Sequence, residues 1–204
     1  MTNIKKTSLE GGGNVSRFSE KDKENYGRRL LEIGEKMFNE QELKDVTVDD
    51  IVKQVGIGKG TFYHYFKNKE QLFMEISNNR QEELFLNMGV HLEGKNCPKD
   101  KFYKAIHYLL EEIAKYPMLA EIDEKTYVQL KKKVPEETKR RNEEIDKKLI
   151  SELEEHGIKF KITSEQTRKL LQLLFVDVTI LRKQKEYETI DLLLRSIGEY
   201  IVYE

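Results

Sequence analysis

The chain is 204 residues long, a length that fits one domain or two small ones. It is 38% hydrophobic and 36% charged with only three prolines, which is typical of charged helical surfaces around an apolar core and excludes collagen-like, low-complexity and disulfide-rich classes. The formal net charge is −1, so any contact with nucleic acid has to come from a local basic patch. The single cysteine, Cys97, cannot form an internal disulfide, which favours a reducing cytoplasm.

No secretory signal or membrane span is expected in this sequence. The lysines near Met1 are not followed by the apolar segment that a signal peptide requires. The most apolar stretch, residues 170–181, contains Gln172 and Asp177 and is far shorter than the about 20 residues that cross a bilayer. We therefore expect a cytoplasmic protein with no membrane partner.

Residues 1–19 have no periodic apolar pattern and carry a run of three glycines at residues 11–13. Such a segment cannot offset the entropy that it would lose on ordering, so we expect a flexible tail. It could be a leader added to the natural chain, or a natural basic arm that carries Lys5, Lys6 and Arg17.

Two amphipathic helices are predicted next in the chain. Over residues 20–39, apolar residues recur at steps of three and four, which places them on one stripe of a helix. That stripe consists of Tyr26, Leu30, Ile33 and Met37. Thr47 and Asp50 then have the pattern of a capping box, and the short helix that they begin is stopped by Gly56.

A third short helix is predicted over residues 59–66, after the turn at residues 56–58. Phe62 and Phe66 lie one helical turn apart, which indicates a helix packed by two aromatic rings. Asn68, followed three residues later by glutamine, has the pattern of another capping box. It predicts a long helix that extends to about residue 90.

The rest of the chain is also helical in its apolar period. Five further helices are predicted, over residues 98–113, 118–133, 136–156, 164–183 and 190–201. We find no convincing strand and no internal repeat. The predicted fold class is therefore all-α.

Two short helices that are joined by a glycine-bearing turn and preceded by a longer helix are the parts of a helix-turn-helix unit. The helix over residues 59–66 would then be the recognition helix, which enters the major groove of DNA. With Phe62 and Phe66 turned inward, about 100° per residue sets the outward face of this helix. That face and its flanks comprise Gly60, Thr61, Tyr63, His64 and Tyr65.

The same segment is locally basic. Residues 56–69 contain Lys59, Lys67 and Lys69 and no acid, a local charge of +3 in a chain of −1 overall. Lys59 stands at the N-terminal end of the helix, where base edges are usually reached. Gly60 allows close approach to a duplex, and the helix N-terminus attracts phosphate oxygens. The pattern predicts a DNA-binding surface.

Residues 47–52 read TVDDIV, and residues 55–72 read VGIGKGTFYHYFKNKEQL. This run resembles the DNA-binding signature of TetR-family transcriptional regulators, over about residues 26–76. The resemblance implies a helical homodimer whose N-terminal domain binds a double-stranded DNA operator and whose larger C-terminal domain binds an effector that releases the DNA. The positions that commonly touch DNA in the family correspond to Thr47, Lys59, Gly60, Thr61, Tyr63, Tyr65 and Lys69. The outward face of the recognition helix adds His64.

Two positions depart from the family pattern. Gly58 replaces a helix-capping serine that is often found there. Asp49 stands where some members place a basic or polar contact, so we do not expect a DNA contact from Asp49.

The sequence gives little support for nucleotide binding, catalysis or metal chemistry. Residues 56–61 superficially resemble a phosphate-binding loop, but no lysine directly precedes Ser or Thr and no strand precedes the loop. The four histidines never pair at metal-ligand spacing, and no G-x-S-x-G motif occurs. We therefore predict no catalytic residue, no metal and no cofactor.

The helix predicted over residues 164–183 is apolar on nearly every side, so it has to be covered by its own domain and by something else. A partner subunit is the simplest cover, and in the family two terminal helices form the dimer interface. A two-fold dimer would place two recognition helices in successive major grooves, about 34–36 Å apart. The expected interface residues are Leu174, Ile190, Leu193, Leu194, Ile197 and Ile201.

The helices after residue 80 are rich in aromatic residues, which predicts a pocket for an apolar or aromatic small-molecule effector. The expected ligand contacts are Tyr103, His107, Tyr127, Phe175 and Asp177. A buried, unpaired Asp177 would demand a cation or a raised pKa, and it would then select a cationic or hydrogen-bond-donating ligand. Alternatively, Asp177 pairs with Arg182 or Arg195, or lies exposed at an interface edge.

We thus predict a tail at residues 1–19, a helix-turn-helix DNA-binding domain at residues 20–68, and a helical effector-binding and dimerisation domain at residues 69–204. The predicted function is transcriptional regulation, with a repressor favoured over an activator. If the basic arm in the tail is natural, it would reach DNA. Two alternatives stay open: a regulator of this fold that responds to a protein partner or to no ligand, and a small helical enzyme.

Overall fold

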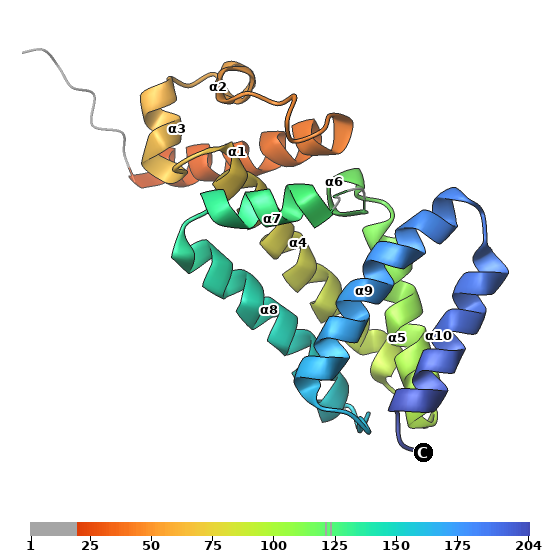
Figure 1. Cartoon of the computed structure of the whole chain (residues 1–204). Helices are drawn as coiled ribbons and strands as arrows, with labels where there is room; N and C mark the ends of the chain where they lie inside the picture. Colours follow the sequence, from red (N-terminus) through yellow and green to blue (C-terminus); the bar gives the residue numbers. More distant parts are fainter. Residues whose placement is uncertain (1–19, 121, 123) are drawn as a thin grey trace, which may run out of the picture.

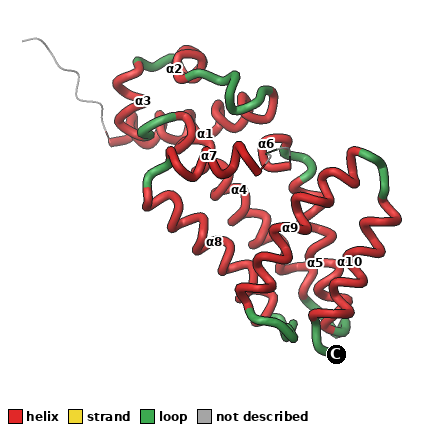
Figure 2. The backbone as a smooth tube through the Cα atoms, viewed as in Figure 1, coloured by secondary structure: helices red, strands yellow, loops and turns green. Residues whose placement is uncertain are grey.

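The computed structural model describes residues 20–120, 122 and 124–204 of the chain (Figure 1). Over these residues the backbone forms ten α-helices and no strand beyond a single bridge between Phe160 and Val202 (Figure 2), which confirms the predicted all-α class. The tail predicted at residues 1–19 lies outside the described residues. The helices are α1 (Glu20–Glu40), α2 (Val48–Val55), α3 (Lys59–Tyr65), α4 (Lys69–Leu92), α5 (Pro98–Ile113), α6 (Pro117–Ala120), α7 (Glu124–Lys133), α8 (Glu136–Glu155), α9 (Ser164–Lys183) and α10 (Tyr187–Ile201).

The single helix predicted over residues 118–133 is wrong. The structure divides this segment into α6 and α7, with residues 121–123 between them. Aspartate is a favoured residue just before a helix, and Asp123 directly precedes α7 in the sequence. Apolar residues recur at helical spacing through the whole segment, so the sequence pattern did not indicate that a second helix begins at Glu124.

Buried apolar side chains form two clusters along α4. The N-terminal cluster joins α1, α2 and α3 to the first turns of α4 and also takes in residues of α6 and α7, such as Met118 and Leu130. The C-terminal cluster joins the rest of α4 to α5, α8, α9 and α10. Figure 1 shows α4 leaving the group of α1 to α3 and entering the second group of helices. The domain boundary expected after residue 68 stays a prediction, because the N-terminal cluster continues to Ile76.

No helix within the described parts of the chain is both long and apolar enough to cross a membrane.

Candidate functional site

The short helix α2 is fixed at both ends by local contacts. The backbone N–H of Asp50 donates to Thr47 Oγ1 at 3.2 Å, and the Thr47 N–H donates back to the Asp50 carboxylate at 3.3 Å. This is the predicted capping box, which satisfies backbone donors that the helix itself leaves unpaired. Gly56 ends α2 with a φ of 76°, a left-handed conformation that favours glycine. Thr47 therefore has a structural role in this chain besides its expected DNA contact.

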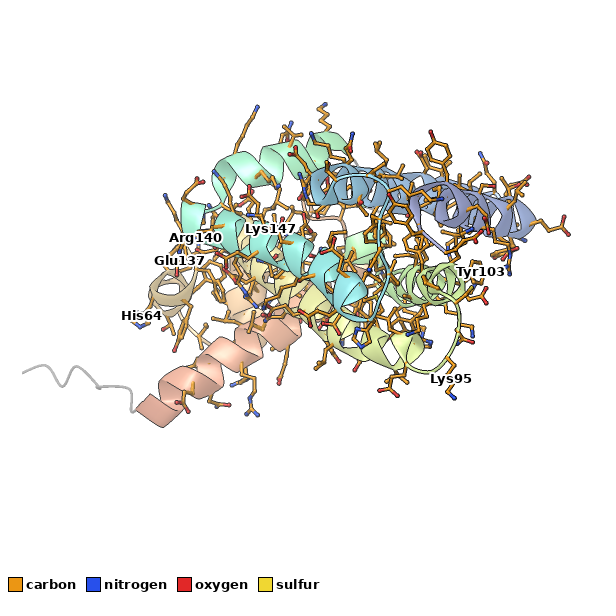
Figure 3. All side chains as sticks on the ribbon, turned by 90° about the horizontal axis from the view of Figure 1, so that it is seen from below. His64, Lys95, Tyr103, Glu137, Arg140 and Lys147 are labelled. Atoms are coloured by element: carbon orange, nitrogen blue, oxygen red, sulfur yellow. The ribbon has the colours of Figure 1, made fainter. Side chains whose placement is uncertain are left out.

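The orientation of α3 is set by two aromatic side chains. Phe62 and Phe66 are buried in the N-terminal cluster, as the sequence predicts. The opposite face carries Gly60 and His64, both exposed, and Tyr63, which is 55% exposed. A Cβ built on Gly60 would meet nothing within 4 Å, so the space above this face is open. Figure 3 shows His64 pointing away from the rest of the molecule.

Lys59, at the first position of α3, is paired with an acid of α2. Its ammonium lies 2.8 Å from the Asp49 carboxylate, and both side chains are more than half exposed. The hydrogen bond and the negative charge of Asp49 raise the pKa of Lys59. In the free protein, Asp49 thus offsets part of the positive charge that the sequence predicts at this face.

Two other expected contact residues face inward in part. Lys69 Nζ donates to the carbonyl oxygens of Val46 at 2.6 Å, Leu43 at 2.7 Å and Lys44 at 3.2 Å. It therefore ties the first turn of α4 to the loop before α2. Tyr65 is half-buried, and its ring carbon Cε1 would lie 3.4 Å from a Cβ built on Gly27 of α1. No pattern in the sequence points to these contacts, which span more than 20 residues for Lys69.

The five expected ligand contacts do not surround one site. The Tyr103 hydroxyl donates to Asp191 of α10, and His107 is exposed beside the Tyr103 ring. The Tyr127 hydroxyl donates to Asn142 of α8 at 3.2 Å, within the polar contacts between α7 and α8. The side chains of Tyr103 and Tyr127 thus contact different neighbouring helices, and the ligand contacts stay a prediction.

Asp177 does not face a pocket. Its side chain is exposed, and it lies two residues after Phe175, which at about 100° per residue is almost the opposite side of α9. Both arginines considered as partners are engaged elsewhere: Arg182 pairs with Glu111, and Arg195 pairs with Asp191. The structure therefore shows Asp177 exposed and unpaired with either arginine, and its place at the edge of an interface stays a prediction.

Two of the cavities formed by the described residues lie among the helices that follow α3. One is a polar cleft of about 420 Å³ between α4 and α8, in which Arg141 binds Glu75 at 2.6 Å. Figure 3 labels two of its lining residues, Glu137 and Arg140. The other, of about 120 Å³, lies between α5, α6 and α9 and is mostly apolar. We call it the α5–α9 cavity. It is lined by Leu110, Ile113, Ala114, Ala120, Phe175, Val178, Thr179, Arg182 and Lys183. Only Phe175 among the expected ligand contacts lines it.

Most of the expected interface residues belong to the core of this chain. Leu174, Ile190, Leu194 and Ile201 are at most 5% exposed within the C-terminal cluster, so a partner cannot cover them, and their assignment to the interface is wrong. Leu193 and Ile197 are partly buried. The exposed apolar residues on these two helices are instead Leu173, Ile180, Tyr187, Leu192 and Tyr200. The sequence did not distinguish the two faces, because the apolar residues of α9 lie on nearly every side of the helix.

The described residues contain no group of three or more His, Cys, Asp or Glu side chains that could hold a metal ion.

A short helix capped at both ends, a tight glycine turn and an outward-facing second helix, all packed on a longer helix, define a helix-turn-helix protein. Residues 30–76 match the family model described as bacterial regulatory proteins, tetR family. This match covers the helix-turn-helix unit and agrees with the resemblance on which the sequence-based expectation rests.

Comparisons with individual proteins agree with this assignment. The chain is 33% identical over 87 residues to the HTH-type transcriptional regulator YhgD of Bacillus subtilis, a match that covers 43% of this chain and 44% of that relative. Two solved structures share the fold at 19% identity. A TetR transcriptional regulator from Rhodococcus sp. RHA1 has a TM-score of 0.59, over 86% of this chain and 95% of that one. FadR from Bacillus subtilis in complex with stearoyl-CoA has a TM-score of 0.55, over 84% and 95%.

Proposed function

We propose that this protein is a DNA-binding transcriptional regulator, a repressor that a small-molecule effector releases from its operator. The observation that carries the proposal is the outward face of α3, where Lys59, Gly60, Tyr63 and His64 are exposed on a helix that is anchored by Phe62 and Phe66. Such a face has the size and polarity that major-groove recognition requires. A protein that regulates transcription in this way acts in the cytoplasm and needs no catalytic group.

Mobility-shift titrations on DNA flanking the gene of this protein test DNA binding. Thr61→Ala or Lys59→Ala should cost about 1–3 kcal/mol at particular bases, because direct readout depends on individual side chains. Lys147→Ala, at an exposed position of α8, serves as a control that should bind like the unmodified protein. If all three variants bound with unchanged affinity, α3 would not be the reading helix.

The proposal includes a homodimer through the exposed sides of α9 and α10, which pack together at one edge of the molecule (Figure 1). Leu173 is 64% exposed and Leu192 is 66% exposed, while Leu171 and Leu174 of α9 and Leu194 of α10 are buried in the core. Exposed leucines on two adjacent helices favour an apolar contact with a second copy, and a two-fold contact would pair both helices with their equivalents.

Light scattering in solution tests the dimer. Leu173→Glu should shift the mass toward that of a monomer, because it places an unpaired charge in the interface. Leu86→Glu is the matched control, since Leu86 is 79% exposed on α4. A dimer that survived Leu173→Glu but not Leu86→Glu would move the interface to α4.

A further inference from the structure

We propose that the α5–α9 cavity binds a small apolar monocarboxylate, whose carboxylate accepts hydrogen bonds from Arg182. The proposal rests on the proposed function, because it identifies the chemical class of the effector. It replaces the cationic ligand that Asp177 suggested, since Asp177 is exposed and does not line this cavity.

The walls of the cavity suit a short aliphatic or aromatic group. Leu110 and Ile113 of α5, Ala120 of α6, and Phe175 and Val178 of α9 line it. A dry apolar cavity of about 150 Å³ in another protein holds benzene, a ligand of six carbon atoms. The volume of about 120 Å³ here is smaller and thus fits about five non-hydrogen atoms, enough for the four-carbon alkyl chain of pentanoate with its carboxylate at the polar edge of the cavity.

Arg182 supplies the polar end of the site. Its side chain is only 20% exposed, and one terminal nitrogen pairs with Glu111 of α5. Its Nε atom is buried and has no hydrogen-bond acceptor among the described residues. A buried donor without an acceptor is costly, and guanidinium groups bind carboxylates through two parallel hydrogen bonds. Glu111 accepts from only one terminal nitrogen of this guanidinium, which carries five N–H donors. A carboxylate in the cavity would accept from other donors of the same group, whereas an ammonium would be repelled.

A simpler account of Arg182 is its position in the last turn of α9, where a basic residue stabilises the helix C-terminus. That account explains the charge, but it does not explain why the arginine lines an apolar cavity or why its buried Nε has no acceptor among the described residues. Lys183 also lines the cavity, whereas Glu111, the acid paired with Arg182, does not. The charges that line the cavity among described residues are therefore both positive.

Calorimetric titration of the full chain without DNA tests the ligand class. Pentanoate is the probe, and 1-pentanol and pentylamine are matched probes that share its chain and differ in the polar group. Pentanoate should bind at least about tenfold more tightly than 1-pentanol, because hydrogen bonds to charged groups are the stronger class. Equal binding of the alcohol, or tighter binding of the amine, would overturn the proposal.

Variants of the lining residues test the position. Arg182→Met should weaken pentanoate binding about tenfold or more, and Arg195→Met, an exposed arginine of α10 outside the cavity, should leave it unchanged. Arg182→Lys keeps a positive charge near Glu111 but removes Nε, so it separates loss of the guanidinium from loss of folding. Ala120→Leu should weaken binding by filling the space. Full pentanoate affinity in Arg182→Met and Ala120→Leu would overturn the proposal.

The same preparations should be tested for DNA binding. Protein that binds pentanoate but no DNA would contradict the proposed function and leave the carboxylate site in place. Protein that binds DNA but not pentanoate would contradict the site alone.

Discussion

Asp49 and Lys59 show how a single acid can set the charge of a recognition surface. The sequence places an acid at position 49, and the structure shows that its carboxylate lies 2.8 Å from the Lys59 ammonium. A phosphate that approaches Lys59 has to compete with this carboxylate. The pair therefore lowers general attraction to DNA while it holds the lysine side chain at the start of α3.

Replacing Asp49 by asparagine should strengthen DNA binding severalfold. The substitution removes one negative charge from the surface that faces DNA, so the slope of log affinity against log salt should become steeper by about one unit. Affinity measured at several salt concentrations tests this. Glu93→Gln, which removes an exposed acid beyond the far end of α4, should leave both quantities unchanged. An unchanged slope in Asp49→Asn would show that the charge of Asp49 does not act on the DNA phosphates.

The raised pKa of Asp146 in α8 should make the free energy of unfolding depend on pH. Burial raises the pKa of its carboxyl, although Gln172 donates to it at 3.0 Å and Arg168 lies 4.0 Å away. As the pH rises through the ordinary aspartate value of about 4, the unfolded chain ionises first. The free energy of unfolding therefore falls until the folded carboxyl also ionises.

Asp146→Asn should remove this loss. Relative to the unmodified protein, the variant should gain stability between pH 4 and pH 7, because it no longer has to ionise a buried group. Urea unfolding at both pH values measures the difference. If the free energy of unfolding of the variant, relative to that of the unmodified protein, instead fell as the pH rose, the carboxylate of Asp146 would be stabilised by its neighbours in the folded state.

At the scale of single elements, the sequence predicted what local contacts determine. The cap at Thr47, the stop at Gly56 and the inward Phe62 and Phe66 are all set by residues within one or two turns of each other. The two faces of α9 were not predictable, because the apolar residues between positions 170 and 181 lie on nearly every side of that helix. The three carbonyl contacts of Lys69 were not predictable either, since they depend on how α4 packs against a distant loop.

The first turn of α3 lacks a side-chain cap, which gives a prediction about stability. Gly58 is the N-cap residue, its φ is −84°, and a Cβ there would meet nothing within 4 Å. Gly58→Ser should therefore stabilise the protein by about 0.3–1 kcal/mol, because a serine hydroxyl can accept from the free N–H groups of the helix. Thermal unfolding measures the gain.

Gly56→Ser is the matched control for this change. The space around Gly56 is equally open, but its φ of +76° is unfavourable for serine. That variant should lose about 1 kcal/mol. Destabilisation by both substitutions would show that α3 does not accept a serine cap.

At the scale of the whole molecule, the important contact is the one between α1 and residues 114–120, which follow α5 and include α6. We call these residues the α5–α6 corner. The backbone N–H of Met118 in α6 donates to Asn39 Oδ1 of α1 at 3.2 Å. Arg80 of α4 binds Glu35 of α1 at 2.6 Å, and its guanidinium lies 4.6 Å from the centre of the Tyr116 ring. The corner is thus attached to the DNA-binding helices on one side, and through Ala120 it lines the α5–α9 cavity on the other. The sequence did not reveal this link, because the hydrogen bond joins residues that are 79 positions apart in the chain.

A ligand in the cavity should therefore affect DNA binding through α6. If pentanoate weakens the affinity for DNA by some factor, Asn39→Ala should reduce that factor about two- to tenfold, the range expected for loss of one hydrogen bond. The affinity for pentanoate without DNA should stay the same, because Asn39 does not line the cavity. Mobility-shift titrations with and without pentanoate give the factor, and Asn96→Ala, in the exposed loop before α5, is the control. If pentanoate weakened the DNA affinity of Asn39→Ala by the same factor as that of the unmodified protein, the coupling would not depend on this hydrogen bond and would run through α4.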